Sequence, residues 1–368
     1  MPTPPWQPDA RLGGVVAAEP SAKEKAWVIF DRIVAEAAPH GVYTNPWIRH
    51  ADGRLEYAPD YETLVRLLGV PLYLGVDTRT GVPALSLDVW LSYELRRAGF
   101  DSDATWPRGT HPRILPTPVA NLLKAVPAKE RAQLNARLTR SAAVAGVTSA
   151  SANILGKNYL KQVDVIMTDW ATGPELLIST KRMDSSYGKN AANRVEESYG
   201  DAKNLRLRHP LAALGFVFGL RSDILQKEPD TAEWLIDLLG KLGREDDAYH
   251  ATCLVMIEYS DTLAPPKDSG EEPEDPLVAT GLTLDEDADT ELSDVPPSEV
   301  DRALVSLPAV TIRHDAIPHH LSPSTFLAKM VERVLDATPV NLHKPARRRR
   351  VEAEAISDLL EGEQTREA

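Results

Sequence analysis

The feature that most constrains the fold of this chain is a pair of unbroken apolar runs, residues 211–220 and 251–259. Short apolar runs without polar alternation are typical of strands that are buried on both faces of a sheet. Residues 231–242, between the two runs, have the periodicity of an amphipathic helix. The order strand, helix, strand therefore places two buried strands at the centre of the fold.

A predicted hairpin precedes these strands. Residues 163–169 and 176–181 have the composition of strands, and a turn at residues 170–174 joins them. Helical sequence at residues 189–208 then leads into the first apolar run. A hairpin followed by alternating helices and buried strands predicts the α/β class, with a mixed central sheet and helices on both of its faces.

The rest of the chain divides by composition into regions around this core. We expect helices at residues 21–38, 59–68, 85–98, 128–143 and 324–335, short strands at 54–57, 71–76 and 309–313, and a connector at 106–118. The predicted regions are a flexible N-terminus (1–20), a mostly helical region (21–125), the core (126–262), an acidic disordered insertion (263–301), a C-terminal strand and helix that pack on the core (302–340), and a basic, then acidic tail (341–368).

The formal net charge of −13 is confined to one segment. Between Asp261 and Asp301 there are fourteen acidic residues and one basic residue, so the remainder of the 368-residue chain is neutral. This segment is rich in proline and lacks aromatic residues, and it cannot bury enough apolar surface to offset its ordering entropy. We expect a disordered insertion. The alternative is an acidic arm that mimics DNA and shields a binding site.

Several classes of protein are excluded. The single cysteine, Cys253, cannot form a disulfide framework or a cysteine zinc site. No apolar stretch approaches the ~20 residues of a membrane span, and the N-terminus lacks the features of a signal peptide. Walker-type, GxSxG and HExxH motifs are absent from the sequence. We expect a cytoplasmic protein that does not enter membranes.

The predicted hairpin brings an acid and a lysine together. With the turn centred near Thr172, Asp164 is expected across from Thr180 and diagonal to Ser179 and Lys181. Diagonal neighbours on paired strands lie roughly 7–8 Å apart, so one metal-bound phosphate can bridge them. The same register places Asp169 opposite Glu175, about 20 Å along the strand from the lysine. Glu175 is therefore excluded from the site.

With these residues the chain resembles the PD-(D/E)XK nuclease superfamily, which has a restriction-endonuclease-like fold. The family pattern is an acid on one strand, then a second acid, any residue and a lysine on the next. Asp164 matches the first acid, with Val163 where the family often has proline, and Lys181 matches the lysine. Ser179 replaces the second acid, as in some restriction enzymes of this superfamily that take a carboxylate from the following helix. The resemblance covers about residues 126–260.

The resemblance implies a metal-dependent site that hydrolyses phosphodiester bonds. Mg²⁺, or Mn²⁺ in its place, would be bound by Asp164, the backbone of Thr180 and one displaced glutamate. Lys181 would orient or deprotonate the water that attacks phosphorus, while the metal stabilises the charge of the transition state. Ser179 completes the expected catalytic set.

Two adjacent glutamates, Glu196 and Glu197, are candidates for the displaced ligand. The apolar stripe of their helix is predicted to include Val195 and Tyr199. Glu196 is one step of roughly 100° from Val195 and flanks this stripe, whereas Glu197 is two steps away and points to solvent. The phase therefore favours Glu196, with Glu197 as the alternative.

The segment after the lysine has the composition of a DNA contact, since cations and hydroxyls bind phosphates. The expected DNA-binding residues are Arg182, Ser185, Ser186, Tyr187, Lys189, Asn190 and Arg194. A solvated helix face is the competing interpretation. The arginine run at residues 347–350 is expected to be either a phosphate-binding tail or a solubilising run.

The favoured hypothesis is a Mg²⁺-dependent DNA endonuclease of the type II-like restriction or phage-defence class. Cutting both strands of double-stranded DNA requires two active sites, so a homodimer is expected. One alternative is a catalytically inactive nuclease-like protein that binds nucleic acid or serves in assembly. Another is a structural protein whose acidic arm binds a basic partner.

Overall fold

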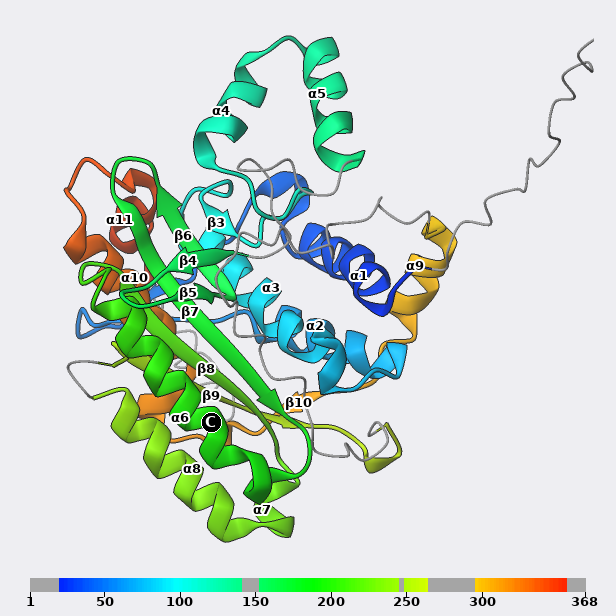
Figure 1. Ribbon diagram of the computed structural model, residues 1–368, viewed down its shortest axis with the longest axis vertical. Helices are drawn as coiled ribbons and strands as arrows, with labels where there is room; N and C mark the ends of the chain where they lie inside the picture. Colours follow the sequence, from blue (N-terminus) through cyan, green and yellow to red (C-terminus); the bar gives the residue numbers. More distant parts are fainter. Residues whose placement is uncertain (1–19, 141–151, 245–247, 264–294, 356–368) are drawn as a thin grey trace, which may run out of the picture.

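The computed structural model describes residues 20–140, 152–244, 248–263 and 295–355, and Figure 1 shows their arrangement. The core is a six-stranded sheet in the order β10-β9-β8-β7-β6-β3. Its strands are β3 (Thr105–Trp106), β6 (Val165–Asp169), β7 (Gly173–Met183), β8 (Ala213–Arg221), β9 (Ala251–Glu258) and β10 (Thr311–Ile312). β7, β8 and β9 are mutually parallel, and the remaining pairs are antiparallel. The predicted α/β class with a mixed sheet is confirmed.

Helices cover both faces of this sheet (Figure 1). One group consists of α1 (Ala22–Ala37), α2 (Tyr61–Leu74), α3 (Val82–Arg97) and α10 (Pro323–Ala337), and the other of α6 (Tyr187–Arg206) and α8 (Pro229–Leu242). Successive strand residues point to opposite faces, so Ile178 packs with the first group and Leu177 with the second. The same alternation directs Thr180 toward α3, and Ser179 and Lys181 toward α6.

The N-terminal helices follow their local signals with one exception. α1 begins at the predicted cap, where Ser21 Oγ accepts a hydrogen bond from the Glu24 N–H (3.2 Å) and Glu24 Oε2 accepts one from the Ser21 N–H (2.6 Å). The strand predicted at residues 71–76 is wrong, because α2 continues through Pro71 to Leu74. Much of α2 is buried, and this packing outweighs the hydrogen bond that Pro71 cannot make.

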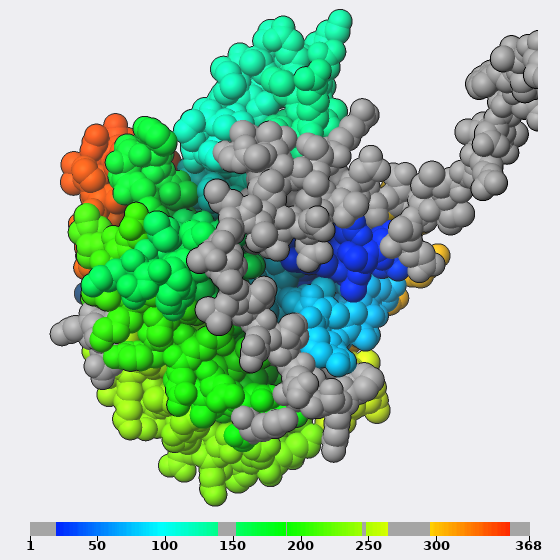
Figure 2. All heavy atoms as spheres, viewed as in Figure 1, coloured from blue at the N-terminus to red at the C-terminus, as the bar shows by residue number. Residues whose placement is uncertain are grey.

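Shorter elements surround the core. β1 (Trp47–Arg49), β2 (Leu55–Tyr57) and β11 (Glu354–Ala355) form a small sheet, and β4 (Asn153–Leu155) pairs with β5 (Leu160–Gln162). The remaining helices are α4 (Thr117–Ala125), α5 (Ala128–Arg140), α7 (Ile224–Lys227), α9 (Pro297–Val305) and α11 (Lys344–Val351). Figure 2 shows α4 and α5 as a lobe that stands out from the body. Among the residues placed in the structure, no helix has the length and apolarity needed to cross a membrane.

The boundaries of the predicted acidic insertion are corrected at its C-terminal end. Residues 297–301, predicted to be disordered, are the first part of α9. Val300 and Ala303 of this helix are buried, and α9 packs against α1. Residues 264–294 lie outside the described residues, as do residues 1–19 and 356–368. The spacing of Val300 and Ala303, three residues apart, indicates a helix with one apolar face. A count of charged residues does not reveal it.

The register of the β6–β7 hairpin also differs from the prediction. Val165 pairs with Ile178, one residue from the expected register, and a bulge follows between Met167 and Thr168. Asp169 therefore lies opposite Gly173 and not opposite Glu175. A bulge adds one unpaired residue to a strand, and no composition rule places it. Glu175 remains at the turn end of β7, as expected.

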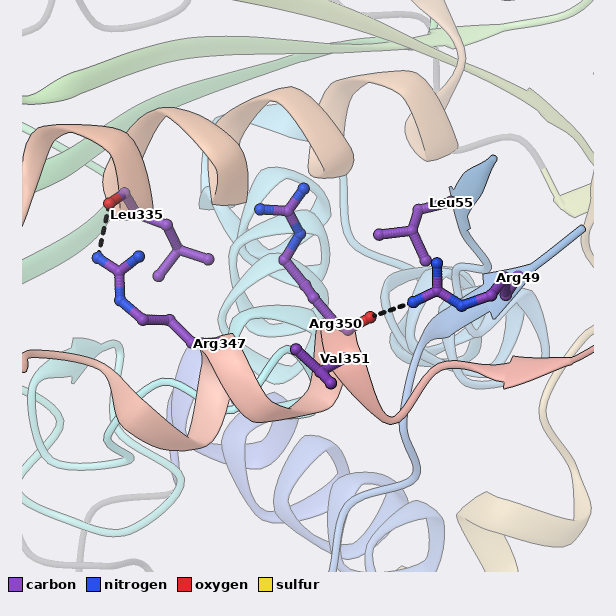
Figure 3. Close-up of a pocket in the computed structure, with 6 residues that line it drawn as sticks. All are labelled: Arg49, Leu55, Leu335, Arg347, Arg350 and Val351. Carbon is purple, nitrogen blue, oxygen red and sulfur yellow. Dashed lines mark hydrogen bonds between the residues drawn. The ribbon is translucent and has the colours of Figure 1, made fainter. Parts of the chain in front are cut away.

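The arginine run at residues 347–350 belongs to the fold. Arg347 donates a hydrogen bond of 2.6 Å to the carbonyl oxygen of Leu335 near the C-terminal end of α10, and Arg349 donates one of 3.0 Å to that of Tyr43. Figure 3 shows Arg347 and Arg350 reaching from α11 around a pocket of about 330 Å³. The Arg347 guanidinium satisfies a carbonyl oxygen that the end of α10 leaves unpaired. The run therefore fastens the C-terminal segment to the core.

Candidate functional site

Asp164 stands directly before β6, beside the middle of β7. One of its carboxylate oxygens accepts a hydrogen bond of 2.7 Å from the backbone N–H of Thr180. The side chain is half-buried, and Val163 next to it is buried. The predicted proximity of Asp164 and Thr180 is confirmed, although a side-chain contact produces it and not strand pairing, since β6 begins at Val165.

Asp88 of α3 is a second carboxylate at this place, and it was not among the expected site residues. The Thr180 hydroxyl donates a hydrogen bond of 2.5 Å to Asp88 Oδ1, so Thr180 links Asp88 to Asp164. Burial of Asp88, and next the negative charge of Asp164, raise the pKa of the Asp88 carboxyl well above its ordinary value. We call Asp88 and Asp164 the acid pair. The available signal was a lone acid between Leu87 and Val89 in an apolar helical run.

Lys181 lies on the other side of β7 and contacts α6. Its Nζ is 3.6 Å from Glu197 Oε1, whereas Glu196 is exposed to solvent. The predicted helix phase, which favours Glu196, is wrong. The buried stripe of α6 includes Ser198 and not Tyr199, which is 36% exposed. This rotation of the stripe turns Glu197 toward the strand and Glu196 away from it.

Glu197 is the centre of a group of charges that we call the Glu197 cluster: Lys161, Lys181, Arg194, Glu197 and Asp201. Lys161 Nζ lies 3.8 Å from Glu197 and 2.8 Å from Asp201, and Arg194 Nη1 lies 3.6 Å from Glu197. Within the cluster as defined, three cations face two carboxylates. All five side chains are at least partly buried, which strengthens their interactions relative to those in water.

Ser179, at the position of the missing acid, lies beside Tyr249. Ser179 is buried, and the Tyr249 hydroxyl beside it donates a hydrogen bond of 2.7 Å to the carbonyl oxygen of Ser198. Burial, and next the charges of Asp201 and Asp164, raise the pKa of Tyr249 well above its ordinary value. A neutral phenol therefore lies within reach of the charges of both Asp164 and Asp201.

The expected DNA-binding residues do not all lie on an accessible surface. Arg182 Nε donates a hydrogen bond of 3.0 Å to Asp184 Oδ1, and the Tyr187 hydroxyl donates one of 3.0 Å to the carbonyl oxygen of Asp184. Both side chains are buried and hold the loop after β7, so their predicted role as DNA contacts is wrong in this conformation. Ser185, Ser186 and Asn190 are partly exposed, Arg194 belongs to the Glu197 cluster, and the side chain of Lys189 lies outside the described residues.

The acid pair has the donor chemistry of a magnesium site. In the part of the chain that the structure describes, no three His, Cys, Asp or Glu side chains form a ready-made metal centre. Mg²⁺ nevertheless needs only one or two carboxylates when waters and substrate phosphates complete its shell. The raised pKa of Asp88 reflects repulsion by Asp164 as well as burial, and a divalent cation would remove that repulsion. The residues present fit the metal.

Comparisons with known proteins leave the site to be interpreted from its geometry. No protein-family model, no curated protein and no solved structure matches this chain. What the geometry provides is an acid pair that suits a divalent cation and, one residue along β7, a group of cations that suits an anion.

Proposed function

We propose that this protein is a metal-dependent DNA endonuclease of the restriction or phage-defence type, with a PD-(D/E)XK-like site. The observation that carries the proposal is the bridge through Thr180, which holds Asp88 and Asp164 together one residue before Lys181. Adjacent carboxylates can hold the divalent cation of a metal-assisted phosphodiester hydrolysis, and the resemblance to the PD-(D/E)XK superfamily assigns the attacking water to the lysine. The expected homodimer and its double-stranded DNA substrate belong to the same proposal.

The proposed roles follow from these contacts. Asp88 and Asp164 would hold Mg²⁺ or Mn²⁺, and Thr180 fixes both carboxylates. When bound, the metal supplies Lewis-acid stabilisation of the charge that develops at the phosphate. Lys181 would orient the attacking water, and Glu197, 3.6 Å from its Nζ, keeps the ammonium group in position. Glu197 thus replaces Glu196 in the proposed site, as a positioning residue for the lysine.

Cleavage of supercoiled plasmid DNA in the presence of Mg²⁺ or Mn²⁺ tests the proposal. We expect nicked and linear products from the wild-type protein and none from the Asp88→Asn and Asp164→Asn variants. Glu196→Gln is the matched control, because it also removes one carboxylate but from the exposed side of α6. Absence of cleavage by the wild-type protein with either metal would contradict the proposal, and so would full activity of both aspartate variants.

A nuclease-like protein that binds nucleic acid without cutting it is the second candidate. The observation in its favour is Ser179, which occupies the position of the second acid and is buried beside Tyr249. The Glu197 carboxylate, surrounded by three cations, does not replace that acid directly. Duplex binding by a wild-type protein that takes up no Mg²⁺ in calorimetry would favour this candidate.

A further inference from the structure

The pocket of about 330 Å³ beside α11 lies apart from the acid pair and the Glu197 cluster, and shares no residue with either (Figure 3). Its lining comes from four elements that are far apart in the sequence: Arg49 of β1, Leu55 of β2, Leu335 of α10, and Arg347, Arg350 and Val351 of α11. Small-molecule sites are concave, with apolar walls and a few polar groups that fix the ligand. Three apolar side chains and three guanidinium groups match that description.

The protein itself holds the guanidinium groups of this pocket in fixed positions. Arg347 Nη2 donates hydrogen bonds to the carbonyl oxygens of Leu335 (2.6 Å) and Thr338 (2.8 Å). Arg49 Nη2 donates one of 3.1 Å to the carbonyl oxygen of Arg350, as Figure 3 shows. These contacts order the side chains before any ligand binds, which lowers the entropic cost of binding.

The charges of the three arginines are only partly compensated. Carbonyl oxygens carry no net charge, and among the residues that the structure describes Glu332 alone forms an ion pair with these arginines, at 2.9 Å from Arg350. Arg49 and Arg347 therefore have no carboxylate partner in that part of the chain. Both side chains are partly buried, so an anion in the pocket would interact with them more strongly than in bulk water.

The arginines of α11 also keep hydrogen-bond donors that the protein does not use. Arg347 donates through Nε and Nη2, and Arg350 donates through Nη2. The Nη1 group of each residue has no acceptor among the described residues. Guanidinium groups bind phosphate and carboxylate oxygens through short, charge-assisted hydrogen bonds, often in pairs. The pocket therefore offers donors and positive charge together.

We propose that this pocket binds a small organic phosphate monoester, with the phosphate on the arginines and the organic group against the apolar wall of Leu55, Leu335 and Val351. A phosphate monoester has a charge of about −1.5 to −2 near pH 7, which matches the two arginines that have no carboxylate partner. A carboxylate has a single charge and matches them less well. The site is separate from the proposed nuclease site and does not depend on its chemistry.

Calorimetric titration of the full chain with three small anions tests this site. Phenyl phosphate has both the phosphate and an apolar ring, methyl phosphate lacks the ring, and benzoate has the ring with a single negative charge. We expect saturable binding of phenyl phosphate at one site per chain. Methyl phosphate and benzoate should each bind roughly fivefold or more weakly, because one loses apolar burial and the other loses charge.

Two pairs of variants locate the binding in this pocket. Arg49→Gln removes one guanidinium group and should weaken phenyl phosphate binding by about tenfold or more. Its matched control is Arg348→Gln, which removes an exposed arginine of α11 that does not line the pocket and should bind like the wild type. Val351 is 77% exposed at the pocket. Val351→Glu adds an acid there and should also weaken binding about tenfold, whereas the uncharged Val351→Gln should stay close to the wild type.

The outcomes decide the proposal without reference to DNA cleavage. Thermal unfolding without ligand checks that each variant keeps its fold, and the Val351 pair decides if Arg49→Gln does not. Absence of saturable phenyl phosphate binding would overturn the site. Equal weakening by Arg49→Gln and Arg348→Gln, or by Val351→Glu and Val351→Gln, would also overturn it. If benzoate binds as tightly as phenyl phosphate, the assignment to phosphate monoesters is wrong.

Discussion

The two sides of β7 at Thr180 and Lys181 balance charge in opposite ways. On the α3 side, two carboxylates are held through one threonine. On the α6 side, three cations gather around one glutamate. Acids therefore predominate among the groups named on the first side and cations among those on the second. A divalent cation would complement the acids, and the phosphate bound with it would complement the cations. The proposed function therefore depends on Thr180 and Lys181 being adjacent in β7.

The two sides also differ in their expected effect on the stability of the fold. Asp88 is 7% exposed and has an acid beside it, so its charge is poorly solvated. The side chains of Lys181 and Glu197 are 24% and 31% exposed, and each has an oppositely charged neighbour. Burial of like charges destabilises a fold, whereas a half-exposed ion pair is close to neutral. The acid pair is therefore expected to lower the free energy of unfolding while it serves the proposed function.

The largest effect is expected from removing one group on each side. Asp164→Ala and Lys181→Ala should each slow DNA cleavage by about 100-fold or more, which corresponds to ~3 kcal/mol of transition-state stabilisation. The affinity for duplex DNA should change little, because each variant removes a single charged group. Single-turnover cleavage and anisotropy measure the two quantities. If both variants keep more than about a tenth of the wild-type rate, the site is elsewhere.

A smaller effect should distinguish the two glutamates of α6. Glu197→Gln removes the charge that holds Lys181 and is expected to lower the cleavage rate about tenfold, while Glu196→Gln should stay within about twofold of the wild type. The two changes are chemically identical, so each controls for the other. A larger loss of cleavage rate for Glu196→Gln than for Glu197→Gln would mean that α6 rotates when DNA binds. If neither variant changes the cleavage rate, the glutamates of α6 have no part in the mechanism.

The features that the sequence predicts correctly depend on local structure, and those that it misses depend on long-range contacts. The buried strands β8 and β9 and the position of α6 follow from local periodicity. Asp88 was missed because it meets Thr180 from 92 positions away in the chain. The bulge after Met167 has no compositional mark, and the phase of α6 depends on Ser198, a polar residue that tertiary packing buries. Contacts between distant elements thus determine which side chains meet at the candidate site. The local sequence pattern predicts only the helices and strands that carry them.

The stability of the acid side gives a third prediction. Asp88→Asn keeps an acceptor for the Thr180 hydroxyl but removes the repulsion by Asp164, so it should stabilise the fold by about 1 kcal/mol while cleavage falls. Asp60→Asn is a control for which a stability change of the opposite sign is expected. Burial would raise the pKa of Asp60, but hydrogen bonds from Thr63 and Tyr93 outweigh it and lower the pKa. Loss of that charge should therefore destabilise. Urea unfolding at pH 7 measures both changes, and the same sign for both would contradict this account.

The smallest effect concerns His250, which joins the C-terminal end of α6 to β8. Its Nδ1 accepts a hydrogen bond of 2.9 Å from the Leu214 N–H, and its Nε2 is 2.9 Å from an Arg206 nitrogen. Burial, and next the charges of Arg206 and Arg333, lower the pKa of His250 to about 4, from an ordinary value of 6.5. Between these two values the unfolded chain takes up a proton and the folded protein does not. Stability that is present above pH 6.5 is therefore lost as the pH falls toward 4.

The ring is partly exposed, so solvent screening reduces the loss between pH 7 and pH 5 to about 1 kcal/mol. His250→Asn keeps an acceptor for the Leu214 N–H and cannot be protonated. Its free energy of unfolding should consequently decline less than that of the wild type over this range, although it starts lower because the imidazole packing is lost. Urea titrations at pH 7, 6 and 5 give the difference directly. If the two profiles stay parallel, the neutral imidazole does not hold α6 against the sheet, and the position of Glu197 beside Lys181 must depend on the buried stripe of α6 alone.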